Sequence, residues 1–497
     1  MRGALKQRPP IVVVVGHVDH GKTTLLDYIR KTTVAAREAG GITQAVGAYE
    51  IDHGGRKITF IDTPGHEAFM AMRSRGAAAA DLAILVVAAD EGVKPQTKES
   101  IRILEEAKTP FIVAFTKIDK IQPAALEKAK ADVMTAGVML EGYGGQVSYH
   151  GVSSKTGEGV SDLLDLILLA ADVEDLKFDA SAPASGFVLE VRRDPRRGIE
   201  ATVIVKDGIL RRGDLVKTHT ASGKVKILEN FLGEVVSELE PSAPAITIGF
   251  ESLPKVGEEF AVGALKSAAA AVAPKKAFAP SAPMSAAKKA DTLNLILKAS
   301  DSGSLEALSV VLRGVAGKEG LKTGKKLNII EEGVGDISDG DVKHALATGS
   351  TIIGFKNKAE KGALMLAEAQ SATIITSKIV YDLAKAVEDF LTGAAGPLAA
   401  GELEVLAVFN QEKPEKQLVG GKVLAGIFRG KASCEILRRA ADATPGTDPK
   451  ESKGMGRVLG LREKKTEIAQ AEKGKEIGVL VNAQTLIQVG DKLVIRK

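Results

Sequence analysis

The chain has 497 residues, a formal net charge of +4 at pH 7 and a single cysteine. This length suits three or four domains, and the 44% hydrophobic and 26% charged residues are typical of folded globular domains rather than disordered chains. No apolar run reaches the roughly 18 residues of a membrane helix, and the lone Cys434 excludes an internal disulfide, so we expect a cytoplasmic protein without a membrane partner.

Residues 9–176 alternate short β-rich runs with helical stretches, which predicts a parallel sheet covered by helices. The first run, Ile11–Val15, leads directly into a loop of the form G-x-x-x-x-G-K-T at residues 16–23. Glycines in such a loop let successive backbone N–H groups point toward phosphate oxygens. Lys22 brings a positive charge to the terminal phosphates, and the hydroxyl of Thr23 is a ligand for Mg²⁺. The loop therefore predicts a nucleotide-binding domain.

A second motif, Asp62-Thr63-Pro64-Gly65-His66, follows the predicted strand Ile58–Ile61. An aspartate at the end of a strand in this sheet reaches Mg²⁺ through a water molecule, and the N–H group of the glycine senses a terminal phosphate. The motif therefore predicts the part of the site that distinguishes a triphosphate from a diphosphate.

Two further segments predict which base the site accepts. Thr116-Lys117-Ile118-Asp119 follows the strand Phe111–Phe115, and Ser153-Ser154-Lys155 follows Val152. A carboxylate accepts two hydrogen bonds from N1 and N2 of guanine, and adenine has no such pair of donors. The stem of Lys117 would lie along the base, and backbone N–H groups of residues 153–155 would support it. We therefore expect GTP and GDP as ligands, not ATP.

The rest of the chain changes character several times. A tail at 1–8 precedes the nucleotide-binding domain at 9–176, and short strands with glycine-rich turns at 184–264 predict a β-barrel. An Ala- and Pro-rich linker follows at 265–290, then α/β alternation at 291–394 and short strands again at 395–497. The expected fold class is a multidomain chain of α/β and β-barrel parts: a P-loop GTPase domain, a barrel, an α/β/α domain and a C-terminal barrel.

The motifs GHVDHGKT and DTPGH, read together, resemble those of the translational GTPases. The resemblance implies that residues 39–44 form the first switch and that Thr43 closes over Mg²⁺ and the γ-phosphate. It also implies that His66 orients the attacking water when the ribosome contacts the factor, beside an apolar gate of Val18 and Ile42. The predicted catalytic residues are Lys22 and His66, and the predicted magnesium ligands are Thr23, Thr43 and Asp62. The predicted nucleotide-binding residues are Gly16, His17, Val18, Asp19, His20, Gly21, Lys22, Thr23, Thr24, Asp62, Thr63, Pro64, Gly65, His66, Thr116, Lys117, Ile118, Asp119, Ser153, Ser154 and Lys155.

The predicted third domain indicates which of the translational GTPases the chain resembles. Residues 293–299 with 303–308, and residues 333–338, are similar to the third domain of bacterial-type translation initiation factor two, in a short form without the long N-terminal extension. The resemblance implies a ribosome-dependent GTPase that positions initiator tRNA on the small subunit and promotes subunit joining, and whose GTP hydrolysis releases the factor. The implied partners are both ribosomal subunits, initiator tRNA and other initiation factors, with the chain itself a monomer.

Two segments depart from the family pattern. Thr116 replaces the usual asparagine of the guanine motif, and its hydroxyl would still tether a neighbouring loop. In the last barrel, Gly474-Lys475-Glu476-Ile477-Gly478 replaces the family's Gly-Tyr-Glu-Cys-Gly, and Leu461-Arg462-Glu463-Lys464-Lys465 replaces Leu-Lys-Arg-Phe-Lys. Gly426, Arg462, Glu476 and Gly478 could still form a pocket for the tRNA end. Barrel turns with solvated charges explain these residues equally well, so recognition of the formyl-methionyl group is left open.

Two alternative functions fit parts of the sequence. A specialised elongation-type GTPase that delivers a particular tRNA would share the first two domains, but the α/β module at 291–394 argues against it. A non-hydrolysing RNA scaffold on the ribosome would use GTP only as an anchor, and His66 argues against that. A P-loop kinase is disfavoured by the Thr116–Asp119 segment and by the barrel that follows.

Overall fold

The structure is a computed structural model and describes residues 5–31, 47–263, 292–323, 326–392, 401–410, 416–430, 432–439, 450–463, 466–472 and 474–495. The chain divides into two compact units. The first contains residues 1–285 with the short segments 299–310 and 333–335, and the second contains the remainder. The predicted linker at 265–290 lies outside the described residues. No helix within the described ranges is long and apolar enough to cross a membrane.

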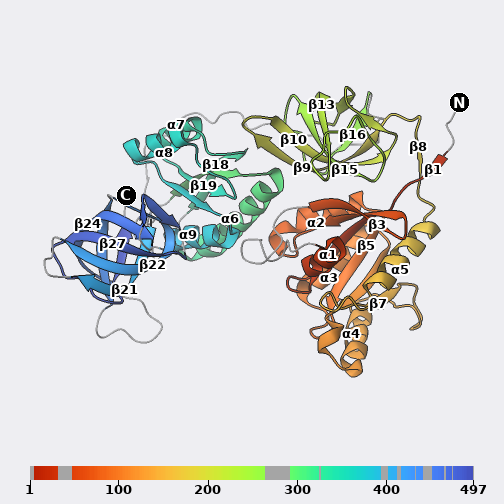
Figure 1. The fold of residues 1–497 in the computed structure, drawn as a ribbon, viewed down its shortest axis with the longest axis horizontal. Helices are drawn as coiled ribbons and strands as arrows, with labels where there is room; N and C mark the ends of the chain where they lie inside the picture. Colours follow the sequence, from red (N-terminus) through yellow and green to blue (C-terminus); the bar gives the residue numbers. More distant parts are fainter. Residues whose placement is uncertain are drawn as a thin grey trace. The chain divides into compact units, whose positions relative to one another are not determined.

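A six-stranded sheet forms the centre of the nucleotide-binding domain (Figure 1). Its strand β2 is buried along its whole length, as expected for a valine-rich strand covered on both faces. All neighbours in the sheet are parallel except β3, which pairs antiparallel with β4. In spatial order the strands are β3 (Gly47–His53), β4 (Arg56–Asp62), β2 (Ile11–Gly16), β5 (Leu82–Ala88), β6 (Phe111–Thr116) and β7 (Tyr149–Gly151).

Helices cover both faces of this sheet, which confirms the predicted fold class. Alternate residues of β2 enter two different cores: Val13 packs in the core that contains Leu104 of α3, and Val14 packs in the core that contains Leu25 of α1 and Leu163 of α5. The helices are α1 (Lys22–Arg30), α2 (Met70–Ala79), α3 (Pro95–Ala107), α4 (Pro123–Thr135) and α5 (Val160–Val173). Because parallel strands end at one edge, the segments after β2, β4, β6 and β7 meet there.

The second part of the first unit is a closed six-stranded barrel, as the short strands and glycine-rich turns predict. Around the ring the strands are β10 (Gly198–Asp207), β15 (Pro244–Phe250), β13 (Ser222–Asn230), β12 (Leu215–Lys217), β16 (Glu259–Val262) and β9 (Ser185–Asp194). Two small two-stranded pairings accompany it: β1 (Leu5–Gln7) with β8 (Lys177–Asp179), and β11 (Leu210–Arg211) with β14 (Glu238–Leu239).

A buried charge cluster joins this barrel to the nucleotide-binding domain. The carboxylate of Asp81 accepts hydrogen bonds from Arg8 at 2.6 and 2.7 Å, from Lys206 of β10 at 2.6 Å and from the N–H of Ile11 at 2.9 Å. The ammonium group of Lys206 also donates to the carbonyl of Ala79, the last residue of α2. Burial alone would raise the pKa of Asp81, but the hydrogen bond from Arg8 and the charges of Lys206 and Arg8 outweigh it and lower this pKa.

We expect Asp81→Asn to lower the free energy of unfolding by about 3–5 kcal/mol, because it leaves two largely buried cations without their counter-charge. The folded pKa of Asp81 lies below its ordinary value of 3.8, so the unfolded chain takes up this proton first as the pH falls. The stabilisation is therefore complete above about pH 5 and is lost below it as the pH falls through the folded pKa. Denaturant unfolding between pH 7 and pH 3 measures both effects.

Asp172→Asn is the matched control, since its ion pair with Arg56 is about half exposed and such pairs contribute about 1 kcal/mol or less. Equal losses in Asp81→Asn and Asp172→Asn would contradict a structural role for the buried cluster.

The second unit begins with a four-stranded sheet in the order β18 (Lys326–Val334), β17 (Thr292–Ala299), β19 (Thr351–Phe355) and β20 (Ile374–Ser377). Helix α7 (Asp339–Thr348) starts at Ser338, whose hydroxyl accepts the N–H of Asp341 while Asp341 accepts the N–H of Ser338, a capping box. The other helices in this part of the sequence are α6 (Ser302–Thr323), α8 (Lys361–Gln370) and α9 (Val380–Thr392). The sequence did not predict α7, α8 or β20.

The last part of the chain is a second barrel. Its sheet runs β21 (Gly401–Asn410), β28 (Lys492–Ile495), β23 (Ser433–Arg439), β24 (Lys450–Glu463), β27 (Glu476–Ala483) and β22 (Gln417–Arg429), and the pairing of β22 with β21 closes the ring. The short strands β25 (Thr466–Ile468) and β26 (Gln470–Glu472) extend it. Cys434 is fully buried in this core, and burial raises the pKa of its thiol to about 11. Its environment is that of a structural residue.

Candidate nucleotide-binding site

The phosphate loop is held in a conformation that needs its glycines. Gly16 has φ 145° and Gly21 has φ 90°, both in the left-handed region. A Cβ atom on Gly16 would lie 2.4 Å from the carbonyl oxygen of Val86, so a larger residue would force the loop away from β5. Helix α1 begins at Lys22, directly after the loop, so the N–H groups of its first turn face the place where phosphates bind.

Lys22 is the buried charge of this loop. Its side chain is 5% exposed, and Nζ donates to the carbonyl oxygens of Gly16 at 3.0 Å and His17 at 2.6 Å. Burial lowers its pKa to about 8, against the attraction of Asp62. Lys22 is therefore charged in most molecules at pH 7, and a bound phosphate would favour the charged form further.

His20 packs the loop against the sheet. The side chain is fully buried, and Nδ1 accepts the N–H of Ala88 at 3.2 Å. Burial lowers its pKa to about 4, so the imidazole is neutral at pH 7 with its proton on Nε2. The carbonyl oxygen of His20 accepts a hydrogen bond from the hydroxyl of Thr116 at 2.6 Å. This is the tether that the hydroxyl of Thr116 was expected to make, and it joins the phosphate loop to the base-binding segment.

The Asp62–His66 segment lies against the phosphate loop. Asp62 is 3% exposed at the end of β4, and the hydroxyl of Thr63 donates to the carbonyl of Val14 at 2.8 Å. A Cβ atom on Gly65 would lie 2.4 Å from Nζ of Lys22 and 3.1 Å from the backbone nitrogen of Val18. The structure therefore places Gly65 against the ammonium group of Lys22.

Asp119 is exposed, but a hydrogen bond from Ser153 fixes the orientation of its side chain. Its Oδ1 accepts the hydroxyl of Ser153 at 2.7 Å, and Ser153 in turn accepts the N–H of Thr156 at 3.2 Å. The hydrogen bond from Ser153 lowers the pKa of Asp119, so the carboxylate is ionised at neutral pH. Lys117 pairs with Glu91 at 3.0 Å, and Ser154 and Lys155 form the turn after Ser153. The two predicted base-binding segments therefore lie together.

Three residues of this region were missed by the sequence reasoning. Gln96 on α3 accepts the N–H of Val18, and Arg73 on α2 donates to two carbonyls of the Asp62–His66 segment and pairs with Glu99. The sequence of α2, which holds Arg73 and Arg75 among small and apolar residues, gives no signal that Arg73 rather than Arg75 is the buried one. Thr43 and Ile42 lie outside the described residues.

The four residues predicted for a tRNA-end pocket are only partly brought together. Arg462 on β24 is opposite Gly478 on β27, and Glu476 is two residues away on the same strand. Gly426 is instead paired with Gly401 on β21. Lys475, next to Glu476, forms an ion pair with Glu463 at 2.9 Å. The substituted segments are therefore joined to each other by a surface salt bridge.

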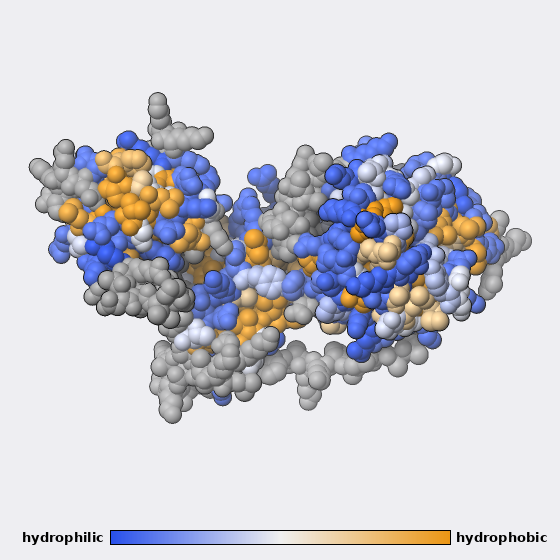
Figure 2. Space-filling view, turned by 90° about the horizontal axis from the view of Figure 1, so that it is seen from below, coloured by the Kyte–Doolittle hydropathy of each residue, from blue (hydrophilic) through white to orange (hydrophobic). Residues whose placement is uncertain are grey.

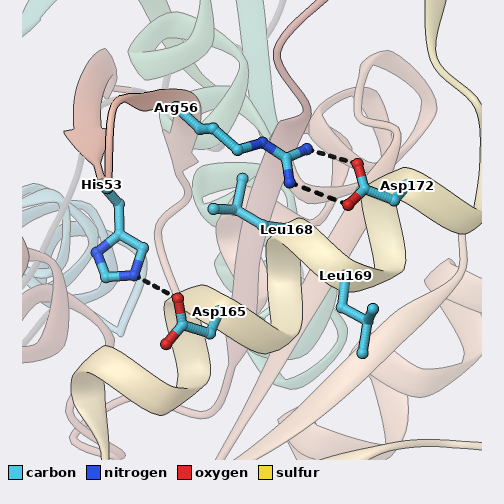
Figure 3. A pocket seen from close by; sticks show the side chains of 7 residues that line it. His53, Arg56, Asp165, Leu168, Leu169 and Asp172 are labelled. Carbon is cyan, nitrogen blue, oxygen red and sulfur yellow. Dashed lines mark hydrogen bonds and ion pairs between the residues drawn. The ribbon is translucent and has the colours of Figure 1, made fainter.

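A shallow pocket in the nucleotide-binding domain contains none of the predicted site residues (Figure 3). The β3–β4 hairpin contributes His53, Gly54 and Arg56, and α5 contributes Asp165, Leu168, Leu169 and Asp172. His53 bonds Asp165 at 2.8 Å, and Arg56 bonds Asp172 at 2.6 and 2.9 Å, so these charges pair with each other across the pocket. We interpret this pocket as the contact of the hairpin with the helix.

Comparisons with known proteins agree with this geometry. Residues 7–172 match the family described as Elongation factor Tu GTP binding domain, 183–263 match Elongation factor G domain 2, and 271–388 match Translation-initiation factor 2. Translation initiation factor IF-2 of Rubrobacter xylanophilus is 37% identical over 98% of this chain and 71% of its own length. The chain belongs to the IF-2 family. It is thus a translation initiation factor with a GTPase domain that binds GTP and GDP, as the motifs predict.

Another relative and a solved structure are also similar to this IF-2 family member. The chloroplastic IF-2 of Euglena gracilis is 38% identical over 99% of this chain, which spans 61% of that relative's length. Among solved structures, GDP-bound aIF5B from Aeropyrum pernix is similar at 25% identity, with 99% of this chain and 92% of that chain covered and a TM-score of 0.43. The match of 271–388 favours initiation over the elongation-type alternative.

Proposed function

We propose that the chain is a ribosome-dependent GTPase that positions initiator tRNA on the small subunit, promotes subunit joining and leaves after GTP hydrolysis. One observation carries the GTP-dependent part: Gly65 lies against both Lys22 and the amide of Val18. A γ-phosphate bound at Lys22 would contact Gly65 directly, so loss of that phosphate changes the contacts of the whole Asp62–His66 segment. The partners would be both ribosomal subunits, initiator tRNA and other initiation factors, with the factor acting as a cytoplasmic monomer.

The oxygen donors at the site fit a magnesium ion. The hydroxyl of Thr23 stands at the start of α1, and the buried carboxylate of Asp62 is close enough to Lys22 to attract its charge. Hydroxyl and carboxylate oxygens are the hard ligands that Mg²⁺ prefers, together with phosphate oxygens and water. We assign Thr23 and Asp62 to the ion, with Thr43 as a third contributor. When bound, the ion would neutralise charge on the phosphate oxygens.

Lys22 and His66 would have different roles in catalysis. The ammonium group of Lys22 stabilises negative charge on the terminal phosphates, together with backbone N–H groups of the loop. His66 is half-buried, directly after Gly65, and its Nδ1 accepts the N–H of Ala68 at 3.4 Å. Its place next to the residue that contacts Lys22 supports a role in orienting the attacking water.

The last barrel has an outer surface suited to a nucleotide base. Phe409 is 67% exposed, and its ring lies over Gly420. Gly420 pairs with Gly478 on β27, and Gly478 pairs in turn with Arg462 on β24, so the three residues form one row across the sheet. An exposed ring beside glycines and an arginine can stack a base and bind its phosphate. Figure 2 shows apolar side chains gathered on the surface of the part at the left, which is this barrel in Figure 1. We propose that the surface around Phe409, Gly420 and Arg462 holds the tRNA end.

We expect Phe409→Ala to weaken binding of initiator tRNA about tenfold in filter-binding assays with the full chain, because one stacked base contributes about 1–3 kcal/mol. Phe231→Ala, at an exposed turn of the first barrel, is the matched control and should leave binding unchanged. Formylated and unformylated initiator tRNA are compared in parallel. Tighter binding of the formylated form supports specificity for it, whereas equal and weak binding of both would overturn the initiator-tRNA assignment.

A further inference from the structure

Helix α3 contacts both the phosphate loop and α2 from one face. Gln96 and Glu99 are three residues apart on α3, so their side chains leave the helix on the same side. Oε1 of Gln96 accepts the backbone N–H of Val18 at 2.9 Å. Oε2 of Glu99 accepts Nη2 of Arg73 at 2.6 Å. One turn of α3 therefore holds the phosphate loop directly and holds α2 through an ion pair.

Arg73 carries this second contact on to the Asp62–His66 segment. Its side chain is fully buried, and Nη1 donates to the carbonyl oxygens of Pro64 at 3.0 Å and His66 at 2.6 Å. These carbonyls flank Gly65, so the guanidinium fixes the backbone on both sides of that residue. The planar guanidinium fixes the direction of each of its hydrogen bonds. The positions of Gly65 and His66 therefore depend on where Glu99 holds Arg73.

The two sets of contacts meet again at Val18. Its amide donates to Gln96, and the same nitrogen would lie 3.1 Å from a Cβ atom on Gly65. The hydrogen bonds therefore run from Val18 through Gln96, α3, Glu99 and Arg73 to the carbonyls on either side of Gly65. The close packing of Gly65 against Val18 closes this path into a ring. Gly65 and Arg73 are buried, whereas Val18, Gln96 and Glu99 are partly exposed. The hydrogen bonds of the ring are 2.6–3.0 Å long, so the loss of one link frees the residues on either side of it.

We propose that Gln96 and the Arg73–Glu99 pair are positioning residues for GTP hydrolysis, which set the spacing between the phosphate loop and the Gly65–His66 backbone. They act through the amide of Val18 and the carbonyls of Pro64 and His66, not on the nucleotide itself. The inference rests on the proposed roles of Gly65 and His66. It predicts that damage to the ring slows hydrolysis and weakens GTP binding relative to GDP binding, since GDP has no phosphate in contact with Gly65.

The test compares Gln96→Leu, Glu99→Gln and the double variant. Each single change should lower the kcat for GTP hydrolysis about tenfold, a size typical of coupling between neighbouring elements, and leave the affinity for GDP within about twofold. The double variant should be no slower than the slower single variant, because either change already opens the ring. Glu106→Gln is the matched control: it removes the exposed ion pair between Glu106 and Arg102 on the same helix, at 2.7 Å, and should leave kcat unchanged.

Three results would overturn the inference: rates within twofold of the unmodified chain, losses that multiply in the double variant, or a fall in GDP affinity and thermal stability that parallels the fall in kcat. Gln96 is only half-buried, so Gln96→Leu keeps the test available if Glu99→Gln folds poorly. Failure of ribosomes to stimulate the unmodified chain would instead contradict the proposed function. In that case the variants are compared with the unmodified chain without ribosomes, by their intrinsic rate of hydrolysis and their ratio of GTP to GDP affinity. The same outcomes then support or overturn the role of the ring.

Discussion

Ribosome-stimulated GTP hydrolysis is expected to fall by about 10²- to 10⁴-fold in His66→Ala, the range typical of a lost residue that positions or deprotonates a reacting group. The affinities for GTP and GDP should stay within about twofold. The reason is the position of the side chain: His66 follows the residue that contacts Lys22, while its backbone is held independently, by Arg73. Removal of the imidazole therefore leaves the phosphate contacts intact.

Single-turnover hydrolysis with and without ribosomes, together with fluorescent-nucleotide binding, measures both quantities. His219→Ala removes an exposed histidine of the first barrel and should behave as the unmodified chain. A ribosome-stimulated rate that is unchanged in His66→Ala would show that another group positions the water. Failure of the unmodified chain to hydrolyse GTP on the ribosome would instead favour the scaffold alternative.

The second large effect is expected at the base. Asp119→Asn should lower GTP affinity at least about 10²-fold and raise the affinity for xanthosine triphosphate, because a site built to hydrogen-bond one partner strongly rejects a ligand that leaves its groups unpaired. Guanine offers donors at N1 and N2, which match a carboxylate. Xanthine has a carbonyl at C2, which matches the N–H of an amide. Ser153 can donate to the amide oxygen as it does to Oδ1, so the orientation of the side chain should persist.

Competition between GTP, xanthosine triphosphate and inosine triphosphate measures this preference in both proteins. Inosine lacks only the 2-amino group, so it should bind the unmodified chain more weakly than GTP and serves as the internal control for one lost hydrogen bond. An Asp119→Asn protein that still prefers GTP over xanthosine triphosphate would overturn the guanine assignment.

Much of the site was predictable because each motif is contiguous in sequence and follows a strand. The predicted strand Phe111–Phe115 became β6, and Ile58–Ile61 lies within the longer β4, so the segments after them had to meet at one edge of a parallel sheet. Local sequence contains this information. The neutral, buried state of His20 was harder to predict, because it depends on how β5 covers the loop.

The contacts of Arg73, Gln96 and Glu99 could not be predicted for a different physical reason. Each links residues from separate elements, and no local pattern states which carbonyl a buried guanidinium will reach. The last barrel was similarly difficult, because its outer surface is formed by strands that are far apart in sequence, such as β21 with Phe409 and β27 with Gly478. Periodicity predicted its short strands but not which residues share a face.

The hydrogen bond from Thr116 to the carbonyl of His20 has a consequence for ligand size. It fixes the base-binding end of the site and the phosphate-binding end at one separation, 2.6 Å from hydroxyl to carbonyl at the junction. We therefore expect the protein to select the length of its ligand as well as its chemical groups. A guanine compound with a correct base and correct phosphates, but with a longer connection between them than ribose, could satisfy only one end at a time.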